Sequence, residues 1–151
     1  MPEEVRRRFM EMVPQAEIAP SPLVGVIAIA QVEERNGITV ELLWMEVREA
    51  GALLHWRARF EQGMGFLMPH VSMTDERSTA YRVLLGEGGG GDHSWAGSLA
   101  VLPGPPSLAT LAIVFESFGA DERIRMPGYI AQEPILGPWE FTVETRDIRQ
   151  T

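Results

Sequence analysis

The residue types of a catalytic triad occur side by side once in the chain, as Asp92, His93 and Ser94. Adjacent residues cannot converge on one reacting atom from different directions, as the members of a triad must. The glycine-rich run before them, Gly86 to Gly91, lacks the Gly-Lys-Ser/Thr ending of a phosphate-binding loop and opens no helical pattern. We therefore expect neither a nucleophile nor a phosphate site here, and we expect residues 88–91 to form a mobile loop tip.

Transition-metal ligands are few, since the chain has three histidines and no cysteine. His55, His70 and His93 show no tight metal-binding spacing such as His-x-His or His-Glu-x-x-His. They could form a site with Asp75 or Asp92 only if distant loops converged. We therefore expect no metal ion, and no motif indicates another cofactor.

Pairs of carboxylates are the remaining candidates for catalysis, because glycosidases use two carboxyl groups about 5–10 Å apart. Glu140 and Glu144 fall on one expected strand, where their spacing separates them by about 13 Å. Glu46, Glu49 and Glu61 are further acidic residues on expected sheet faces. A solvated sheet surface explains all five, and the sequence indicates a protein that is not an enzyme.

The overall charge limits the kind of partner that the chain can have. Its 151 residues carry a formal net charge of −8, and all 13 basic residues are arginine. An acidic chain lacks the positive field that gathers phosphates, so we expect no nucleic-acid partner. The apolar run Leu23–Ala30 is far shorter than the about 20 residues of a membrane helix. With no cysteine, the chain also fits a reducing compartment, and we expect no membrane insertion and a cytoplasmic location.

Alternation of apolar and polar residues dominates from Leu23 onward and predicts an all-β fold. Asn36-Gly37 lies between two apolar runs and predicts a tight hairpin, because both central residues of a type I′ turn need a positive φ. Turn signals divide the chain into eight expected strands, at residues 23–34, 38–49, 52–60, 71–74, 81–85, 95–101, 111–115 and 139–143. Strands without intervening helices predict an antiparallel sandwich, which the long connections 103–107 and 119–138 favour over a barrel.

The first 22 residues follow a different pattern. Apolar residues at helical spacing share one face of a short helix expected over residues 2–13, namely Val5, Phe9, Met12 and Val13. Three prolines then make residues 14–22 an extended linker. We therefore divide the chain into an N-terminal helix and linker, residues 1–22, and a β-sandwich domain, residues 23–151.

Apolar residues are in surplus on the expected second strand, where Leu43, Met45 and Val47 oppose the main core face. Either a bulge switches the faces of this strand, or both of its faces are covered. The apolar helix face with Phe9 and Met12 could cover the surplus within one chain. Otherwise the two surfaces form a homodimer or bind a protein partner.

A basic stripe runs along the polar face of the third strand, through His55, Arg57 and Arg59. Beside Glu41 or Glu46 on the neighbouring strand, this stripe predicts a ladder of cross-strand charge pairs. The alternative is a contact surface for an acidic partner or a small anion. Together with the apolar surplus, the stripe makes up the interaction surface that we expect.

The order of motifs along residues 24–146 resembles a known type of domain. A hairpin on Asn36-Gly37-Ile38-Thr39-Val40 is followed by Trp56, the Asp75 turn and Tyr81; then come Trp95–Val101, Leu111–Phe115 and Gly137-Pro138-Trp139-Glu140-Phe141. This order is similar to immunoglobulin-like domains of unknown function in bacterial surface and anti-sigma-type membrane proteins. The resemblance implies an immunoglobulin-like antiparallel β-sandwich with no catalytic residues. Those proteins usually carry a membrane helix and a separate zinc-type domain, for which this sequence has no matching segment.

The function that we expect is that of a non-catalytic binding or interaction module. The alternative is a small-ligand-binding protein or hydrolase with a pocket between the sheets or under residues 119–138. A purely structural subunit is the third candidate. A pocket lined by histidine and carboxylate would favour the second candidate, and a flat apolar patch would favour the first.

Overall fold

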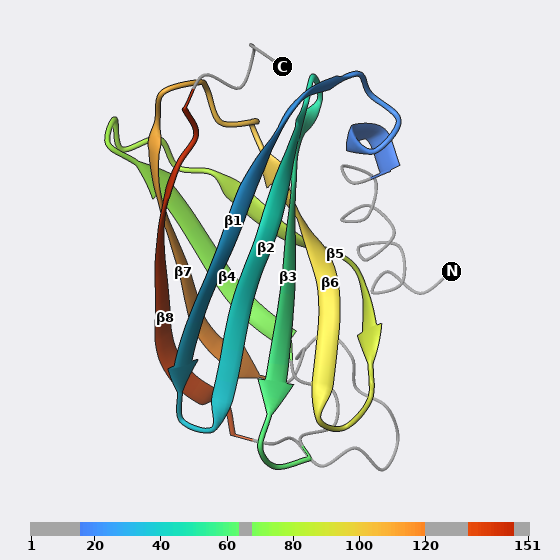
Figure 1. Ribbon diagram of the computed structural model, residues 1–151, viewed down its shortest axis with the longest axis vertical. Helices are drawn as coiled ribbons and strands as arrows, with labels where there is room; N and C mark the ends of the chain where they lie inside the picture. Colours follow the sequence, from blue (N-terminus) through green and yellow to red (C-terminus); the bar gives the residue numbers. More distant parts are fainter. Residues whose placement is uncertain (1–15, 64–67, 120–132, 147–151) are drawn as a thin grey trace, which may run out of the picture.

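In a computed structural model, which describes residues 16–63, 68–119 and 133–146, the chain forms two antiparallel β-sheets. The described residues contain eight strands, namely β1 (Leu23–Arg35), β2 (Ile38–Arg48), β3 (Gly51–Phe60), β4 (Met68–Asp75), β5 (Arg82–Gly90), β6 (Ser94–Leu102), β7 (Thr110–Gly119) and β8 (Ile135–Glu144). One sheet has the order β1-β2-β3-β6-β5 and the other has the order β4-β7-β8. Figure 1 shows them as two layers, with the five-stranded sheet in front. The expected all-β sandwich is confirmed.

The first hairpin forms as its turn residues predict. Asn36 has a φ of 52° and Gly37 a φ of 77°, and the flanking residues Arg35 and Ile38 pair across the turn. This geometry requires a residue that tolerates positive φ at both central positions, which asparagine and glycine do. The hairpin fixes the register of β1 against β2.

Aromatic side chains from both sheets fill the core. Trp56 on β3 meets Phe115 on β7 with ring centroids 5.9 Å apart, and Phe118 meets Trp139 on β8 edge-to-face at 5.2 Å. The indole Nε1 of Trp139 donates a hydrogen bond to the carbonyl of Ile38 at 3.0 Å. That bond satisfies the one polar atom of the buried ring of Trp139. The indole Nε1 of Trp56, by contrast, is buried without a hydrogen-bond partner among the described residues.

A bulge in β2 decides between the two alternatives for its apolar surplus. The register against β3 shifts between Leu42 and Trp44, so the residues after the shift change faces. Met45 and Val47 are 0% and 4% exposed and belong to the main core, whereas Trp44 is 39% exposed. The bulge, rather than a second covered face, accounts for the pattern.

The connection from β4 to β5 passes from one sheet to the other around the carboxylate of Asp75. One carboxylate oxygen accepts the amides of Arg77 and Thr79, both at 2.9 Å, and the other accepts the hydroxyl of Tyr81 at 2.8 Å. Burial works to raise the pKa of Asp75, but these hydrogen bonds together outweigh it and hold the pKa below its ordinary value of 3.8. Burial and the bond to Asp75 raise the pKa of Tyr81.

The described part of the N-terminal segment packs on the outside of the five-stranded sheet. Residues 16–18 form a helical turn, a correction to the extended linker expected over 14–22. Ile18 is fully buried in a second small core with Leu53 of β3 and Ala100 of β6. The predicted helix, residues 2–13, lies entirely outside the described residues. Within the described ranges, no helix has the length and apolar character needed to cross a bilayer.

Three of the four residues expected to form a loop tip, Gly88–Gly90, belong to strand β5, and only Gly91 lies in the β5–β6 turn. Gly88 and Gly90 pair with Gly97 and Trp95 of β6. A Cβ atom on Gly88 would lie 2.7 Å from the Trp95 indole nitrogen, and one on Gly90 would lie 2.0 Å from the carbonyl oxygen of Ser94. The glycines thus allow a close approach between the strands, and that approach keeps them in the sheet.

Candidate functional site

The predicted interaction surface is only partly present as a surface. Phe9 and Met12 lie outside the described residues. Met45 and Val47 are core residues, a correction that follows from the bulge in β2. Leu43 is half-buried at the bulge itself. No continuous apolar surface therefore joins these three β2 residues.

The basic stripe on β3 forms charge pairs with β2. Arg57 donates to the Glu41 carboxylate opposite it, with its Nε 3.1 Å from Oε2, and His55 Nε2 lies 3.1 Å from Glu46 Oε1. Arg59 is exposed and stands opposite Thr39. Two of the three stripe residues, His55 and Arg57, thus direct their side chains to carboxylates of β2, as the predicted ladder requires.

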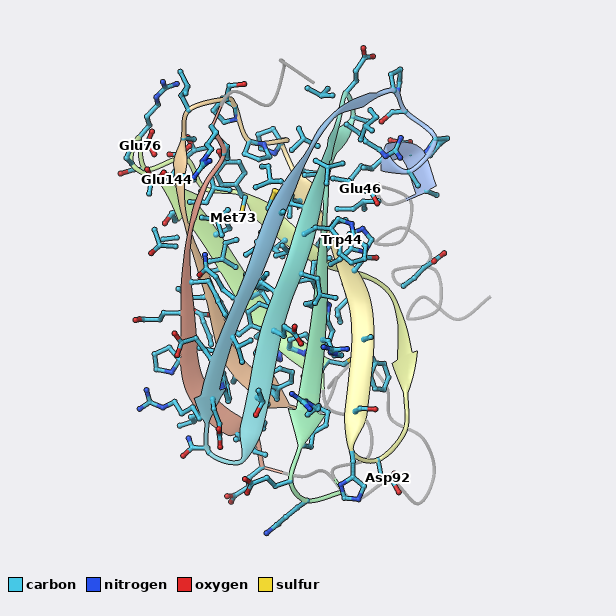
Figure 2. All side chains as sticks on the ribbon, viewed as in Figure 1. Trp44, Glu46, Met73, Glu76, Asp92 and Glu144 are labelled. Carbon is cyan, nitrogen blue, oxygen red and sulfur yellow. The ribbon has the colours of Figure 1, made fainter. Side chains whose placement is uncertain are left out.

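An aromatic stack sits on the same outer face. The rings of Trp44 and His55 stack with their centroids 4.4 Å apart and their planes tilted by 21°. Figure 2 shows Trp44 close to Glu46, the carboxylate that pairs with His55. Arg48 donates to Glu46 at 3.2 Å and to the carbonyl of Ser21 at 2.8 Å. Burial works to raise the pKa of Glu46, but Arg48, His55 and Trp44 together lower it. The cluster is internally satisfied and joins the N-terminal segment to the sheet.

The three histidines lie on separate elements, with His55 on β3, His70 on β4 and His93 in the turn before β6. His93 Nδ1 lies 3.1 Å from the carbonyl oxygen of Phe60. Among the residues that the structure describes, no three histidine or carboxylate side chains gather in a group that could hold a metal ion. Asp92 and His93 are exposed in this turn, and Ser94 is exposed at the start of β6.

A different feature emerges where the two sheets meet along one side, which we call the seam between β1 and β8. Each of these strands is the edge of its own sheet, so no backbone ladder joins them within the described residues. Two side chains bridge the gap instead. Gln31 donates to the carbonyl of Thr142 at 2.8 Å, and Asn36 donates to the carbonyl of Leu136 at 2.7 Å. The seam is therefore closed at the hairpin end by amide side chains.

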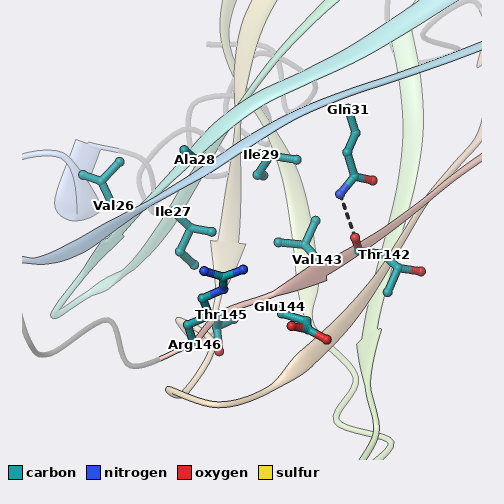
Figure 3. Close-up of a pocket in the computed structure, with 10 residues that line it drawn as sticks. All are labelled: Val26, Ile27, Ala28, Ile29, Gln31, Thr142, Val143, Glu144, Thr145 and Arg146. Atoms are coloured by element: carbon teal, nitrogen blue, oxygen red, sulfur yellow. Dashed lines mark hydrogen bonds between the residues drawn. The ribbon is translucent and has the colours of Figure 1, made fainter.

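Beyond the Gln31–Thr142 bridge the seam opens into a groove of about 500 Å³ (Figure 3). Ile27 and Val143 lie almost fully buried at its apolar floor, and Val26 is 50% exposed at its rim. The exposed lining of the groove as a whole is more polar than apolar. The groove is lined by Val26, Ile27, Ala28, Ile29 and Gln31 on β1 and by residues 142–146 at the end of β8. Two strand edges thus face each other across an apolar floor.

A residue with a strained backbone stands at each end of this groove. Ala30, beside the Gln31–Thr142 bridge, has a φ of 52°, and Arg146, at the open end, has a φ of 48°. A left-handed conformation costs a residue other than glycine roughly 1–2 kcal/mol. At Ala30 the strain accompanies a bulge between Ala28 and Gln31 that breaks the outer edge of β1. Strain of this kind gathers at functional sites.

Arg146 contributes a positive charge to the groove. Figure 3 shows its guanidinium directed back from the end of β8 toward Ile27 on β1. Among the described residues the guanidinium makes no hydrogen bond or ion pair. Glu144 lines the same groove, so a negative charge lies there as well. A guanidinium with no partner matches a carboxylate through its planar set of donors.

Exposed apolar side chains also gather at the seam. Of the six large apolar residues that are exposed in the described part of the chain, three are on β1 and one is on β8: Leu23, Val26, Val32 and Leu136. Long edge strands with apolar side chains and unpaired backbone groups invite pairing with another chain. Of these four residues, Val26 lines the groove itself.

Sequence reasoning missed the residues of this groove. Val26, Gln31, Thr142 and Arg146 carry no motif, and alternation alone does not tell an edge strand from a central one. One signal was available. The first expected strand, residues 23–34, is long and apolar, and no strand is expected before it that could pair with its outer edge.

Comparisons of the chain with protein-family models, curated proteins and solved structures find no match.

Proposed function

We propose that the protein is a non-catalytic binding module that holds a segment of another polypeptide at the seam. The observation that carries this proposal is the groove between β1 and β8, where two strand edges flank an apolar floor. Four of the six exposed large apolar side chains lie along the same two strands. Exposed apolar surface next to unpaired strand edges supports contact with a partner chain.

The finer fold proposed for this module is immunoglobulin-like. The order β2-β3-β6-β5 and β4-β7-β8 corresponds to strands A-B-E-D and C-F-G of the constant-type immunoglobulin fold. Trp56 and Phe115 make their aromatic contact between the strands that correspond to B and F. On this reading β1 is an added strand beside A, and it supplies one wall of the groove.

Two expectations about context remain part of the proposal. A formal charge of −8 supports a partner other than nucleic acid, and the absence of cysteine supports a cytoplasmic location. A homodimer is the competing form of partner, since β1 of a second copy could approach the same edge.

A small-ligand-binding protein is the second candidate, supported by the volume of the groove. At about 500 Å³ it falls within the range of roughly 300–1,000 Å³ that small-molecule sites occupy. Its position between the edges of the two sheets also fits the expected pocket between the sheets. The unpaired strand edges favour a polypeptide, because an extended chain can satisfy the row of backbone groups that they present.

The test is selection of a displayed library of random heptapeptides on the purified protein. Val26→Glu places a charge at the rim of the groove, and Val32→Glu is its matched control. Both valines are exposed on β1 and both stand opposite a glutamate of β2, but Val32 lies beyond the bulge and outside the groove. Selected peptides should bind wild type and Val32→Glu alike and Val26→Glu about tenfold more weakly or worse. No enrichment, or equal binding to Val26→Glu, would overturn the proposal.

A further inference from the structure

We infer that the groove takes its guest as an added β-strand, paired with the free edge of β1 and anchored by a carboxylate on Arg146. This inference rests on the proposed function and adds the binding mode and the chemistry of the guest. Three features carry it: the position of the unpaired edges, the spacing of the groove's two ends and the charge at its open end.

The edge of β1 supplies the pairing surface. On its inner side β1 pairs with β2, and within the described residues its other side has no ladder partner. β1 and β8 run in opposite directions along the two sides of the groove (Figure 1). An extended chain beside Val26–Ile29 would lengthen the five-stranded sheet by one strand and lie against β8 as its second wall. Strand addition of this kind satisfies backbone donors and acceptors that water otherwise holds.

The two ends of the groove fix the length of the guest. The Ala30 bulge and the Gln31–Thr142 bridge block one end, and Arg146 stands at the other. The four β1 residues between these ends, 26–29, span about 10 Å from the first Cα atom to the last, at the rise of a strand. A guest therefore makes contact through about four to six residues. Because side chains alternate across a strand, every second guest residue faces Ile27 and Val143 and is apolar.

Charge decides the remaining feature of the guest. The Arg146 guanidinium is directed into the groove without a partner among the described residues. A carboxylate on the guest would form a charge-assisted, bidentate pair with it. Two sources share this chemistry, namely an Asp or Glu side chain and a free C-terminal carboxylate.

A second copy of the chain is the weaker occupant. Pairing of β1 with another β1 needs a long regular edge, and the Ala30 bulge interrupts this one near its middle. Bulges on edge strands are a known protection against edge-to-edge association. A short guest that ends at the bulge avoids this obstacle.

The experiment measures the fluorescence anisotropy of four labelled hexapeptides with the full chain. The parent probe alternates threonine and valine, ends in glutamate and has an amidated C-terminus. The second probe is the parent with alternate backbone amides methylated. In the third probe glutamine replaces the glutamate, and the fourth is the third with a free C-terminal carboxylate. The protein variants are Arg146→Gln, Val26→Glu and the control Val32→Glu.

The inference predicts that methylation weakens binding at least tenfold, because a methylated amide cannot donate to a strand edge. The glutamine probe should bind about tenfold more weakly than the parent, and Arg146→Gln should remove that difference. Recovery of binding by the fourth probe identifies the C-terminal carboxylate as an accepted source. No recovery limits the carboxylate to a side chain, and both results agree with the inference.

Equal binding of the methylated and parent probes would overturn strand addition. If Val26→Glu still abolished binding in that case, the proposed function would stand and only the binding mode would be wrong. A glutamine penalty that persists in Arg146→Gln would overturn the role of Arg146. If no probe binds at protein concentrations up to about 1 mM, the inference fails. A dimer that Val26→Glu dissociates, with no peptide binding, would replace the guest strand with a second copy.

Discussion

Single residues fix the places where this chain departs from regular strands. Asp75 ends β4, and its carboxylate accepts three hydrogen bonds from the connection that leads from one sheet to the other. Ala30 and Arg146 adopt left-handed conformations at the two ends of the groove. At each of these positions a backbone or charge constraint determines the local structure more than hydrophobicity does.

The Asp75 carboxylate should make stability depend on acid pH. Its pKa is lower in the folded chain than the ordinary value of 3.8, so the ionised carboxylate stabilises the fold above that pH. The contribution is lost as the pH falls below 3.8 and through the lower folded value. Urea unfolding of wild type and Asp75→Asn should therefore differ most near neutral pH and converge in acid. A constant difference across this range would contradict the assignment.

Tyr81→Phe provides a control that leaves the carboxylate in place. It removes the hydroxyl that donates to Asp75 in a nearly buried position. The midpoint of thermal unfolding at neutral pH should fall by a few degrees, since a charged acceptor then loses one donor. An unchanged midpoint would show that this hydrogen bond does not stabilise the connection from β4 to β5.

The strain at Ala30 predicts a stabilising substitution. Ala30→Gly should raise the free energy of unfolding by about 1 kcal/mol, because glycine adopts a φ of 52° without the steric cost. Ala28→Gly, at the last regularly paired residue of β1 before the bulge, should lower it by about 0.5–1 kcal/mol. Denaturant unfolding measures both, and a loss of stability in Ala30→Gly would show that the bulge stores no strain.

At the scale of the element, β2 shows how one inserted residue moves a whole set of side chains. The register shift between Leu42 and Trp44 carries Met45 and Val47 into the core and brings Trp44 to the outer face. The strand therefore joins two alternating segments of opposite phase. That arrangement explains why its sequence reads as apolar on both faces.

Truncation of β2 side chains tests this change of phase. Met45→Ala should lower the free energy of unfolding by about 2–5 kcal/mol, the usual cost of a buried cavity. Leu43→Ala, at the half-buried bulge, should cost about 1 kcal/mol or less. The reverse order, measured by urea unfolding, would contradict the register of β2 and β3.

Alternation and turn chemistry predicted most of these elements. The Asn36-Gly37 hairpin and the eight strands follow from local signals, because side-chain period and positive φ are properties of short segments. The strand at Gly88–Gly90 was missed because its glycines serve a contact with Trp95 that only the paired strand creates. The groove was missed because it depends on which strands become edges, and that is settled by the order of the sheets.

At the scale of the whole molecule, the two sheets pack through an aromatic core and separate along one side. The small core under Ile18 attaches the described end of the N-terminal segment to the outer face of the larger sheet, away from the groove. The seam is held at the hairpin end by Gln31 and Asn36 and is open at the other end. The N-terminal attachment and the proposed binding groove therefore lie on different surfaces of the sandwich.

Ile18→Ala should lower stability without changing binding at the groove. Loss of a fully buried side chain in the small outer core should lower the free energy of unfolding by about 2 kcal/mol. Binding of the parent hexapeptide should stay within about twofold of wild type, because Ile18 does not line the groove. Fluorescence anisotropy at a temperature where the variant is folded checks this expectation. A large loss of affinity would show that the small outer core and the groove are coupled.

The most direct test of strand addition at the seam is residue-resolved amide hydrogen exchange, followed by NMR with and without the parent hexapeptide. The two edges of the five-stranded sheet, β1 and β5, provide an internal comparison in the same molecule. We predict that bound peptide slows exchange of the outward-facing amides within residues 26–29, while the edge amides of β5 stay unchanged. Unchanged exchange in residues 26–29 under saturating peptide, or protection at β5 instead, would contradict the account.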